Sequence, residues 1–128
     1  MLDVDHFKVL NDTKGHPEGD KVLQSIASTL EAHVRDTDMV GRYGGEEFVV
    51  VMPGSQSLEQ VTQKAEDLRI KVFKLGITVS IGATVFREGE SVADLYERVD
   101  GLLYQSKQNG RNRTTNDAGE VEAGGLNV

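Results

Sequence analysis

The sequence predicts an α/β domain of the ferredoxin-like type: an α+β sandwich of βαββαβ order, with helices flanking a central, mainly antiparallel sheet. Of the 128 residues, 38% are hydrophobic and 27% are charged, which suits a single globular core. Apolar residues recur at helical spacing in three stretches and alternate in another. A Gly-Gly pair separates two β-prone runs, which is typical of a hairpin.

The first half of the chain is predicted to hold a strand, a long helix and the hairpin. Apolar residues between positions 22 and 34 recur at spacings of three and four, and Asp20 stands where the N-cap of that helix is expected. The segment 11–20 is polar and punctuated by glycine, which predicts a loop. The expected strands are 1–4, 39–43 and 47–52.

The second half predicts two helices with a strand between them. Ser57 and Ser91 are each followed three residues later by a side chain that completes a capping pattern, so a helix is expected after each serine. Residues 77–85 alternate between apolar and small polar side chains, which indicates a strand. The last residues lack periodicity, so we expect a folded domain over 1–112 and a disordered tail over 113–128.

Charge and composition exclude several classes of protein. The formal net charge of −7 argues against general nucleic-acid binding, because lysine and arginine supply most of that affinity. No apolar run approaches the roughly 20 residues of a membrane helix and no signal peptide opens the chain, so we expect no membrane insertion. The absence of cysteine favours a cytoplasmic location. A phosphate-bearing ligand would therefore need a metal or a few locally placed cations.

Acidic side chains stand next to two of the predicted strands. Asp3 and Asp5 lie at the end of the first strand, and Glu46 and Glu47 follow the Gly-Gly pair. Such hard oxygen ligands are those that Mg²⁺ prefers, and the hairpin can bring a second carboxylate to a metal held by Asp3. The alternative is that all four are ordinary turn residues on a solvated surface.

Polar and basic residues elsewhere fit a nucleotide. Asn11 and Asp20 can together read the hydrogen-bonding edge of guanine, or they can serve as ordinary loop and cap residues. Lys8, Lys107 and Arg111 can reach phosphates. The alternative for Lys107 and Arg111 is that they complement the dipole of the last helix.

Taken together, these residues resemble the GGDEF domain of diguanylate cyclases, here as the variant Gly44-Gly45-Glu46-Glu47-Phe48. The resemblance spans residues 1 to about 113 and implies a nucleotide-cyclase-like fold. About 40 residues that usually come first in the family are absent, so we expect an N-terminally truncated domain that lacks its first helix. Further matching blocks, in the family's order, are LDVDHFK at 2–8, Asn11-Asp12, Gly15-His16, Gly19-Asp20, TVSIG at 78–82, Tyr104, Lys107 and GRN at 110–112.

The resemblance implies a nucleotidyltransferase that condenses two GTP into cyclic di-GMP and two pyrophosphates. It also implies two Mg²⁺ or Mn²⁺ ions in each active site, held by Asp3, the Val4 carbonyl and Glu46, with Glu47 supporting the metal or the nucleophile. Asn11 and Asp20 match the guanine-reading pair. The triphosphate contacts of the family match Lys8, Lys107, Arg111 and the backbone amides near Phe7.

Arg35 and Asp38 match the R-x-x-D site at which many family members bind their product; the alternative is a helix end followed by a turn. Because each domain presents one GTP, the resemblance implies catalysis across a homodimer, with a sensory or receiver domain elsewhere in the full-length protein. An alternative function is a catalytically silent receptor for GTP or cyclic di-GMP. A family branch that makes mixed dinucleotides replaces the guanine-reading aspartate, whereas Asp20 is retained.

Overall fold

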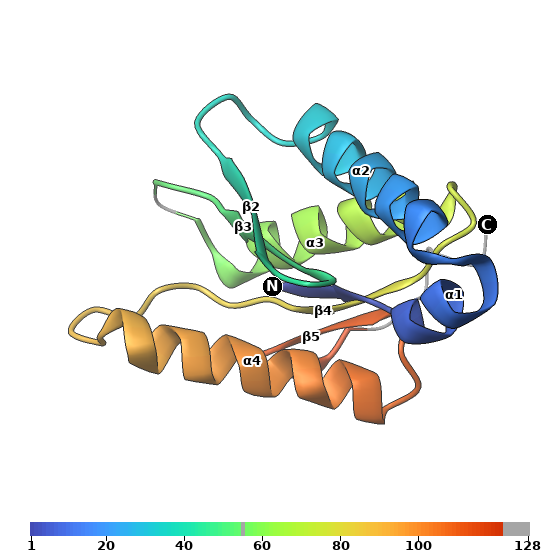
Figure 1. The fold of residues 1–128 in the computed structure, drawn as a ribbon. Coiled ribbons are helices and arrows are strands. Elements are labelled where there is room, and N and C mark those ends of the chain that lie inside the picture. Colours follow the sequence, from blue (N-terminus) through green and yellow to red (C-terminus); the bar gives the residue numbers. More distant parts are fainter. Residues whose placement is uncertain (55, 122–128) are drawn as a thin grey trace.

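The computed structural model describes residues 1–54 and 56–121, and in this part of the chain six strands form one sheet of order β2-β3-β1-β4-β5-β6 (Figure 1). Strands β2, β3, β1 and β4 pair antiparallel in the order of a ferredoxin-like sheet, and β5 joins β4 in parallel. The predicted fold class is therefore confirmed. The strands are β1 Leu2–Val4, β2 Met39–Gly44, β3 Glu47–Val51, β4 Val79–Gly82, β5 Arg113–Asn116 and β6 Gly119–Glu120.

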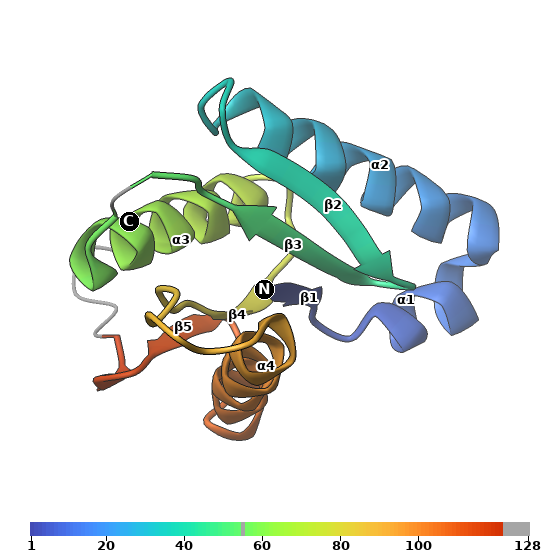
Figure 2. The same ribbon diagram turned by 90° about the vertical axis from the view of Figure 1, so that its left-hand side faces the viewer.

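Helices cover both faces of the sheet, with α2 and α3 on one side and α4 on the other (Figures 1 and 2). Successive side chains of β1 point to opposite faces of the sheet. Leu2 and Val4 enter the core with α2 and α3, whereas Asp3 between them reaches Lys107 of α4. The four helices of the described chain are α1 Phe7–Lys14, α2 His16–Ala32, α3 Leu58–Phe73 and α4 Val92–Gln108.

The core lies between the sheet and the α2–α3 layer. Ile26 and Leu30 of α2 and Val72 of α3 are completely buried there against Phe48 of β3. Full burial of such a side chain stabilises the fold by about 1.5–3 kcal/mol. Packing against this layer holds β1 and β3 in place, so their polar ends stay paired in register.

Helix α4 approaches β4 closely because β4 ends in a glycine. A Cβ at Gly82 would lie 2.5 Å from both the Leu103 nitrogen and the Val99 oxygen of α4, so no larger residue fits. The Ser106 hydroxyl, near the end of the helix, donates to the Ile81 carbonyl at 2.7 Å. These contacts bring the C-terminal turn of α4, which carries Lys107, over the end of β1.

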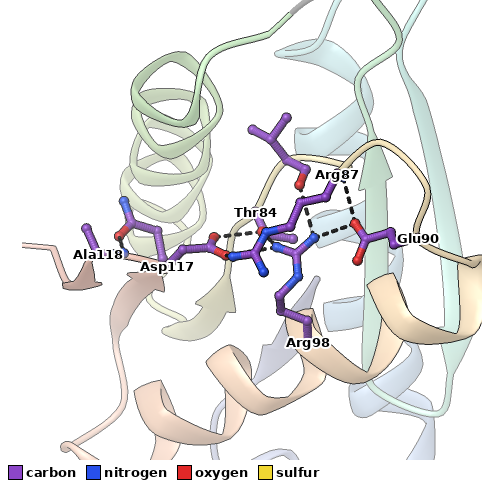
Figure 3. A network of polar contacts seen from close by, with 8 residues as sticks. Thr84, Arg87, Glu90, Arg98, Asp117 and Ala118 are labelled. Atoms are coloured by element: carbon purple, nitrogen blue, oxygen red, sulfur yellow. Dashed lines mark hydrogen bonds and ion pairs between the residues drawn. The ribbon is translucent and has the colours of Figure 1, made fainter.

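Polar contacts of Arg98 and Arg87 fix the N-terminal half of α4 to neighbouring segments (Figure 3). Arg98 donates to Glu90 at 2.5 Å and to Asp117 at 2.8 Å, and it also contacts the Thr84 hydroxyl. Arg87 donates to the same Asp117 carboxylate at 2.8 Å. The β4–α4 connection and the β5–β6 turn are thus bound to one helix, which the sequence patterns did not reveal.

The capping predictions are confirmed at both later helices. Ser57 accepts from the Gln60 amide, and the Gln60 side chain accepts from the Ser57 amide, which completes a capping box for α3. Ser91 accepts from the Asp94 amide at the start of α4. Each helix therefore begins where its serine was expected to cap it.

The loop predicted over 11–20, with Asp20 as N-cap, is wrong. This segment belongs to two helices, α1 and α2, which are separated by Gly15 alone at a φ of 89°. Pro17 lies in the first turn of α2, where its missing N–H costs nothing, and Asp20 lies inside the helix. Glycine followed closely by proline was the available start signal.

The predicted disordered tail is wrong for residues 113–121. Strand β5 pairs with β4, and its two threonines, Thr114 and Thr115, are completely buried. β-Branched residues fit a pleated strand, but four residues are too few to show alternation. The rest of that prediction, 122–128, lies outside the described residues.

Strand β4 is shorter than the predicted 77–85, since it covers only Val79–Gly82. No helix in the described chain is long and apolar enough to cross a membrane.

Candidate active site

Three carboxylates meet where β1 runs beside the turn of the β2–β3 hairpin. Asp3 is paired directly with Glu47 in the antiparallel ladder, so the two side chains share one face of the sheet. The Val4 amide donates to the Glu46 carbonyl at 3.1 Å, which fixes the turn against β1. The structure therefore brings Asp3, Val4, Glu46 and Glu47 together, as the sequence predicted.

Burial and nearby negative charge act on all three carboxylates, and for Asp3 that charge is Asp5. Asp3 is 5% exposed, and burial raises its pKa above the ordinary value. Burial likewise raises the pKa of Glu46 and of Glu47, and the nearby Asp3 charge raises both further. A cluster of this kind gains from a cation that screens the repulsion, which is a common arrangement at functional sites.

Two basic side chains from the end of α4 face this cluster. The Lys107 ammonium lies 2.5 Å from Asp3 Oδ2 and works against the burial effect on the Asp3 pKa. The Arg111 charge acts on the Asp3 pKa in the same direction. Lys107 thus lies at the carboxylate site with Arg111 nearby, and the triphosphate contacts expected of both stay a prediction.

The hairpin turn itself is braced by its neighbours. The Arg42 guanidinium donates twice to the Gly45 carbonyl, at 2.9 and 2.6 Å. The rings of Tyr43 and Tyr96 of α4 lie 5.0 Å apart, and the neighbouring Tyr43 raises the pKa of Tyr96 to about 12. A Cβ added at Gly45 would meet nothing within 4 Å, so the turn is open to a ligand.

The predicted base-reading pair lies where α1 packs on α2. The Asn11 Oδ1 atom is buried and has no hydrogen-bond partner among the described residues. A Cβ at Gly19 would lie 1.9 Å from this atom, so glycine is required there for Asn11 to keep its position. Asp20, the next residue along α2, is exposed.

The start of α1 follows β1 closely in the chain and supplies backbone amides. Phe7 is 7% exposed and anchors the first turn, and the preceding residue, His6, has a left-handed φ of 56° and makes no side-chain cap. The amides of such a first turn are available to an anion. Lys8 follows in the same turn and is exposed.

Asp5 does not join the carboxylate group. Its two oxygens accept from the Thr78 hydroxyl at 2.7 Å, the Ser80 hydroxyl at 2.6 Å and the Asn112 amide at 3.0 Å. These three donors come from segments far apart in sequence, so no spacing rule signalled the arrangement. The interpretation of Asp5 as a second metal carboxylate beside Asp3 is not supported.

Arg35 and Asp38 form one tight pair away from this site. The Arg35 backbone N–H donates to Asp38 at 2.8 Å, and its guanidinium donates at 3.0 and 2.7 Å. These hydrogen bonds lower the pKa of Asp38, whose side chain is fully buried, whereas Arg35 stays largely exposed. Arg35 also borders a depression of about 450 Å³ beside Gln60 and Lys64.

The donor set fits a divalent cation that is shared with a ligand. No three His, Asp or Glu side chains in residues 1–54 and 56–121 are arranged to enclose a metal by themselves. Mg²⁺ is usually bound by one or two carboxylates together with water and substrate phosphates. Asp3 and Glu46, with the Val4 carbonyl, supply oxygen ligands of that kind.

Comparisons with known proteins show which family the sequence matches. The family model described as "Diguanylate cyclase, GGDEF domain" matches residues 1–113. The sequence is 44% identical over 119 residues to the diguanylate cyclase DgcM of Escherichia coli, which covers 88% of this chain and 29% of DgcM. The chain thus spans less than a third of that relative.

Solved structures share the fold. The GGDEF domain of DgcB from Caulobacter crescentus, in complex with c-di-GMP, has a TM-score of 0.85 and 39% identity, covering 90% of this chain and 74% of that one. The active GGEEF domain of a diguanylate cyclase from Vibrio cholerae has a TM-score of 0.80 and 34% identity, covering 90% and 78%.

Proposed function

The chain belongs to the GGDEF family of diguanylate cyclases, and we propose that it condenses two molecules of GTP into cyclic di-GMP with release of two pyrophosphates. The observation that carries this proposal is the meeting of Asp3 with Glu46 and Glu47 beside Lys107. In the proposed reaction each 3′-hydroxyl attacks the α-phosphate of the other GTP, and each bond to pyrophosphate breaks.

Asp3, the Val4 carbonyl and Glu46 are the proposed ligands of two divalent cations, Mg²⁺ or Mn²⁺. When bound, these ions supply positive charge that activates the hydroxyl and stabilises the phosphoryl group and the leaving pyrophosphate. Glu47, opposite Asp3, supports the ligands or the attacking hydroxyl. The raised pKa values of the carboxyls reflect burial and repulsion that such charge would relieve.

The remaining residues bind and orient the nucleotide. Asn11 and Asp20 read the guanine edge, and the unpartnered Asn11 oxygen supports a ligand at this place. Lys8, Lys107 and Arg111, with the backbone amides at Phe7, hold the triphosphate. An acidic domain with net charge −7 needs these local cations to retain a polyanion.

Catalysis is proposed to require two copies of the chain. Each domain holds one GTP, so both attacks take place across a two-fold interface. The product is proposed to bind at Arg35 and Asp38, where a guanidinium beside a depression can pair with phosphate. We place the reaction in the cytoplasm, under a sensory or receiver domain in the full-length protein.

Incubation of the purified chain with GTP and Mg²⁺, followed by chromatography of the products, tests this function. We expect cyclic di-GMP and pyrophosphate, both lost when EDTA is added. The second candidate is a catalytically silent receptor for GTP or cyclic di-GMP. Nucleotide binding without any product, at chain concentrations that permit dimers, would favour the receptor over the cyclase.

A further inference from the structure

The loop after α4 has a backbone that few sequences adopt. Gly110, Arg111 and Asn112 all have positive φ, at 118°, 65° and 47°. This region is unfavourable for residues with a Cβ, and two such residues in succession persist only where surrounding contacts hold them. One contact is local, from the Arg111 amide to the Ser106 carbonyl at 2.9 Å.

Two charged side chains from distant elements hold the end of this loop from different sides. The Asn112 amide donates to Asp5 Oδ2 at 3.0 Å, just after β1. Arg69 of α3 donates through Nη1 to the Asn112 carbonyl at 3.3 Å and to its Oδ1 at 2.6 Å. Both the backbone and the side chain of Asn112 are therefore fixed.

Each of these two side chains is itself immobilised. Asp5 accepts from Thr78 at 2.7 Å and from Ser80 at 2.6 Å, so both of its oxygens are held. Arg69 is 4% exposed and is ion-paired with Glu66 at 2.7 Å. A charged group as enclosed as Arg69 keeps a fixed geometry, because a shift would leave a buried charge unpaired.

The loop lies beside the carboxylate site. Asp3 and Asp5 stand on one short segment, so the residue that ligates the proposed cations and the residue that holds Asn112 cannot move independently. Arg111 precedes Asn112, and its amide is bonded to the Ser106 carbonyl at the end of α4, next to Lys107, whose ammonium contacts Asp3 at 2.5 Å. A loop held at Asn112 therefore keeps Arg111 close to the position of a bound triphosphate.

We propose that Asp5 and Arg69 are positioning residues that clamp Asn112 and thereby present Arg111 to the phosphates of the bound nucleotide. This inference rests on the proposed function, since it takes a nucleoside triphosphate as the ligand. It requires that the loss of the clamp weaken nucleotide binding through Arg111, beyond any effect on the fold.

Binding of the non-hydrolysable analogue GpCpp in Mg²⁺ tests the clamp. Asp5→Ala is expected to raise the Kd about tenfold or more. Asp5→Asn should stay within about threefold, because its carbonyl still accepts from the Asn112 amide. The double variant Asp5→Ala/Arg111→Ala should bind no more weakly than Arg111→Ala alone. Wild-type affinity in Asp5→Ala, or penalties that multiply in the double variant, would overturn the proposal.

Amide hydrogen exchange at Asn112 gives a second reading without nucleotide. Exchange should quicken in Asp5→Ala and in Arg69→Lys, whose single ammonium cannot replace the guanidinium fork, while the Ile81 amide in β4 stays slow. If the wild type fails to bind GpCpp, the proposed function fails, but hydrogen exchange at Asn112 still tests whether Asp5 and Arg69 hold this residue. An exchange rate at Asn112 that stays at the wild-type value in Arg69→Lys would refute the clamp. This variant also provides the test if Asp5→Ala does not fold.

Discussion

Single residues at the site are held in positions that are unfavourable without a ligand. Three half-buried or buried carboxyls repel one another, and the buried Asn11 Oδ1 has no partner among the described residues. Unsatisfied groups of this kind cost stability, and binding sites commonly retain them because a ligand later satisfies them. The proposed guanine and cation contacts account for both features.

Asp20 is the residue on which base selectivity is expected to depend. Asp20→Ser removes the carboxylate that accepts from the guanine edge, so the preference for GTP over ATP should fall at least about tenfold. Competition between the two nucleotides in a binding or turnover assay measures this ratio. Asp12→Ser, at an exposed position on α1, is the matched control and should keep the wild-type ratio.

Asp38 gives the fold a predictable dependence on pH. Its pKa is lowered by the Arg35 hydrogen bonds, so the folded state keeps the charge after the unfolded chain, near 3.8, has taken up a proton. The stabilisation is therefore present above pH 3.8 and is lost as the pH falls through the lower folded value.

Urea unfolding at neutral and acidic pH measures this contribution. Asp38→Asn should be less stable than wild type at pH 7, and the difference should shrink below pH 3.8. An equal difference at both pH values would contradict the assignment of the shift to Asp38.

At the scale of elements, the sequence was informative wherever one local rule decided the outcome. Serine caps located α3 and α4, and the Gly-Gly pair located the hairpin. The polar residues between positions 11 and 20 favour a loop by composition, and the break between α1 and α2 is marked only by Gly15 and Pro17, which signal a helix start. Strand β5 has no local sequence signal, because its stability comes from pairing with β4 and from burial under α3 and α4.

The candidate site likewise contains residues that the sequence predicts and contacts that it does not. Resemblance to the family predicts the motif residues Asp3, Glu46 and Asn11. The pairing of β1 with β3 explains why Asp3 lies beside the hairpin. The Asp5–Asn112 and Arg69–Asn112 contacts join residues 107 and 43 positions apart. Sequence spacing cannot predict such contacts, because they depend on how the finished sheet places its helices.

Packing of α1 on α2 depends on Gly19. In Gly19→Ala the added methyl would overlap Asn11 Oδ1, so we expect a loss of about 1–3 kcal/mol in unfolding free energy and weaker GTP binding. Gly101→Ala in α4 is the control, since its Cβ meets nothing within 4 Å, and it should stabilise the helix by about 0.5–1 kcal/mol. Thermal unfolding and nucleotide titration of both variants measure these effects, and unchanged GTP affinity in Gly19→Ala would count against the role of Asn11.

For the whole molecule, the proposed reaction requires that a second copy face the carboxylates of β1 and the β2–β3 turn. If two chains each present one GTP, the rate per chain should rise in proportion to chain concentration below the dimer dissociation constant. Product formation over a dilution series measures this. A rate per chain that stays constant on dilution while the chain is monomeric by light scattering would exclude the two-chain mechanism.

The proposed function requires above all that Asp3 and Glu46 share divalent cations with the bound nucleotide. Electron paramagnetic resonance of Mn²⁺, titrated into the chain with GpCpp, counts the tightly bound ions and tests this most directly. We predict two ions per wild-type chain, and fewer or much weaker sites in Glu46→Gln and Asp3→Asn, with turnover of GTP lowered at least a hundredfold. Two tightly bound ions in both variants would contradict it.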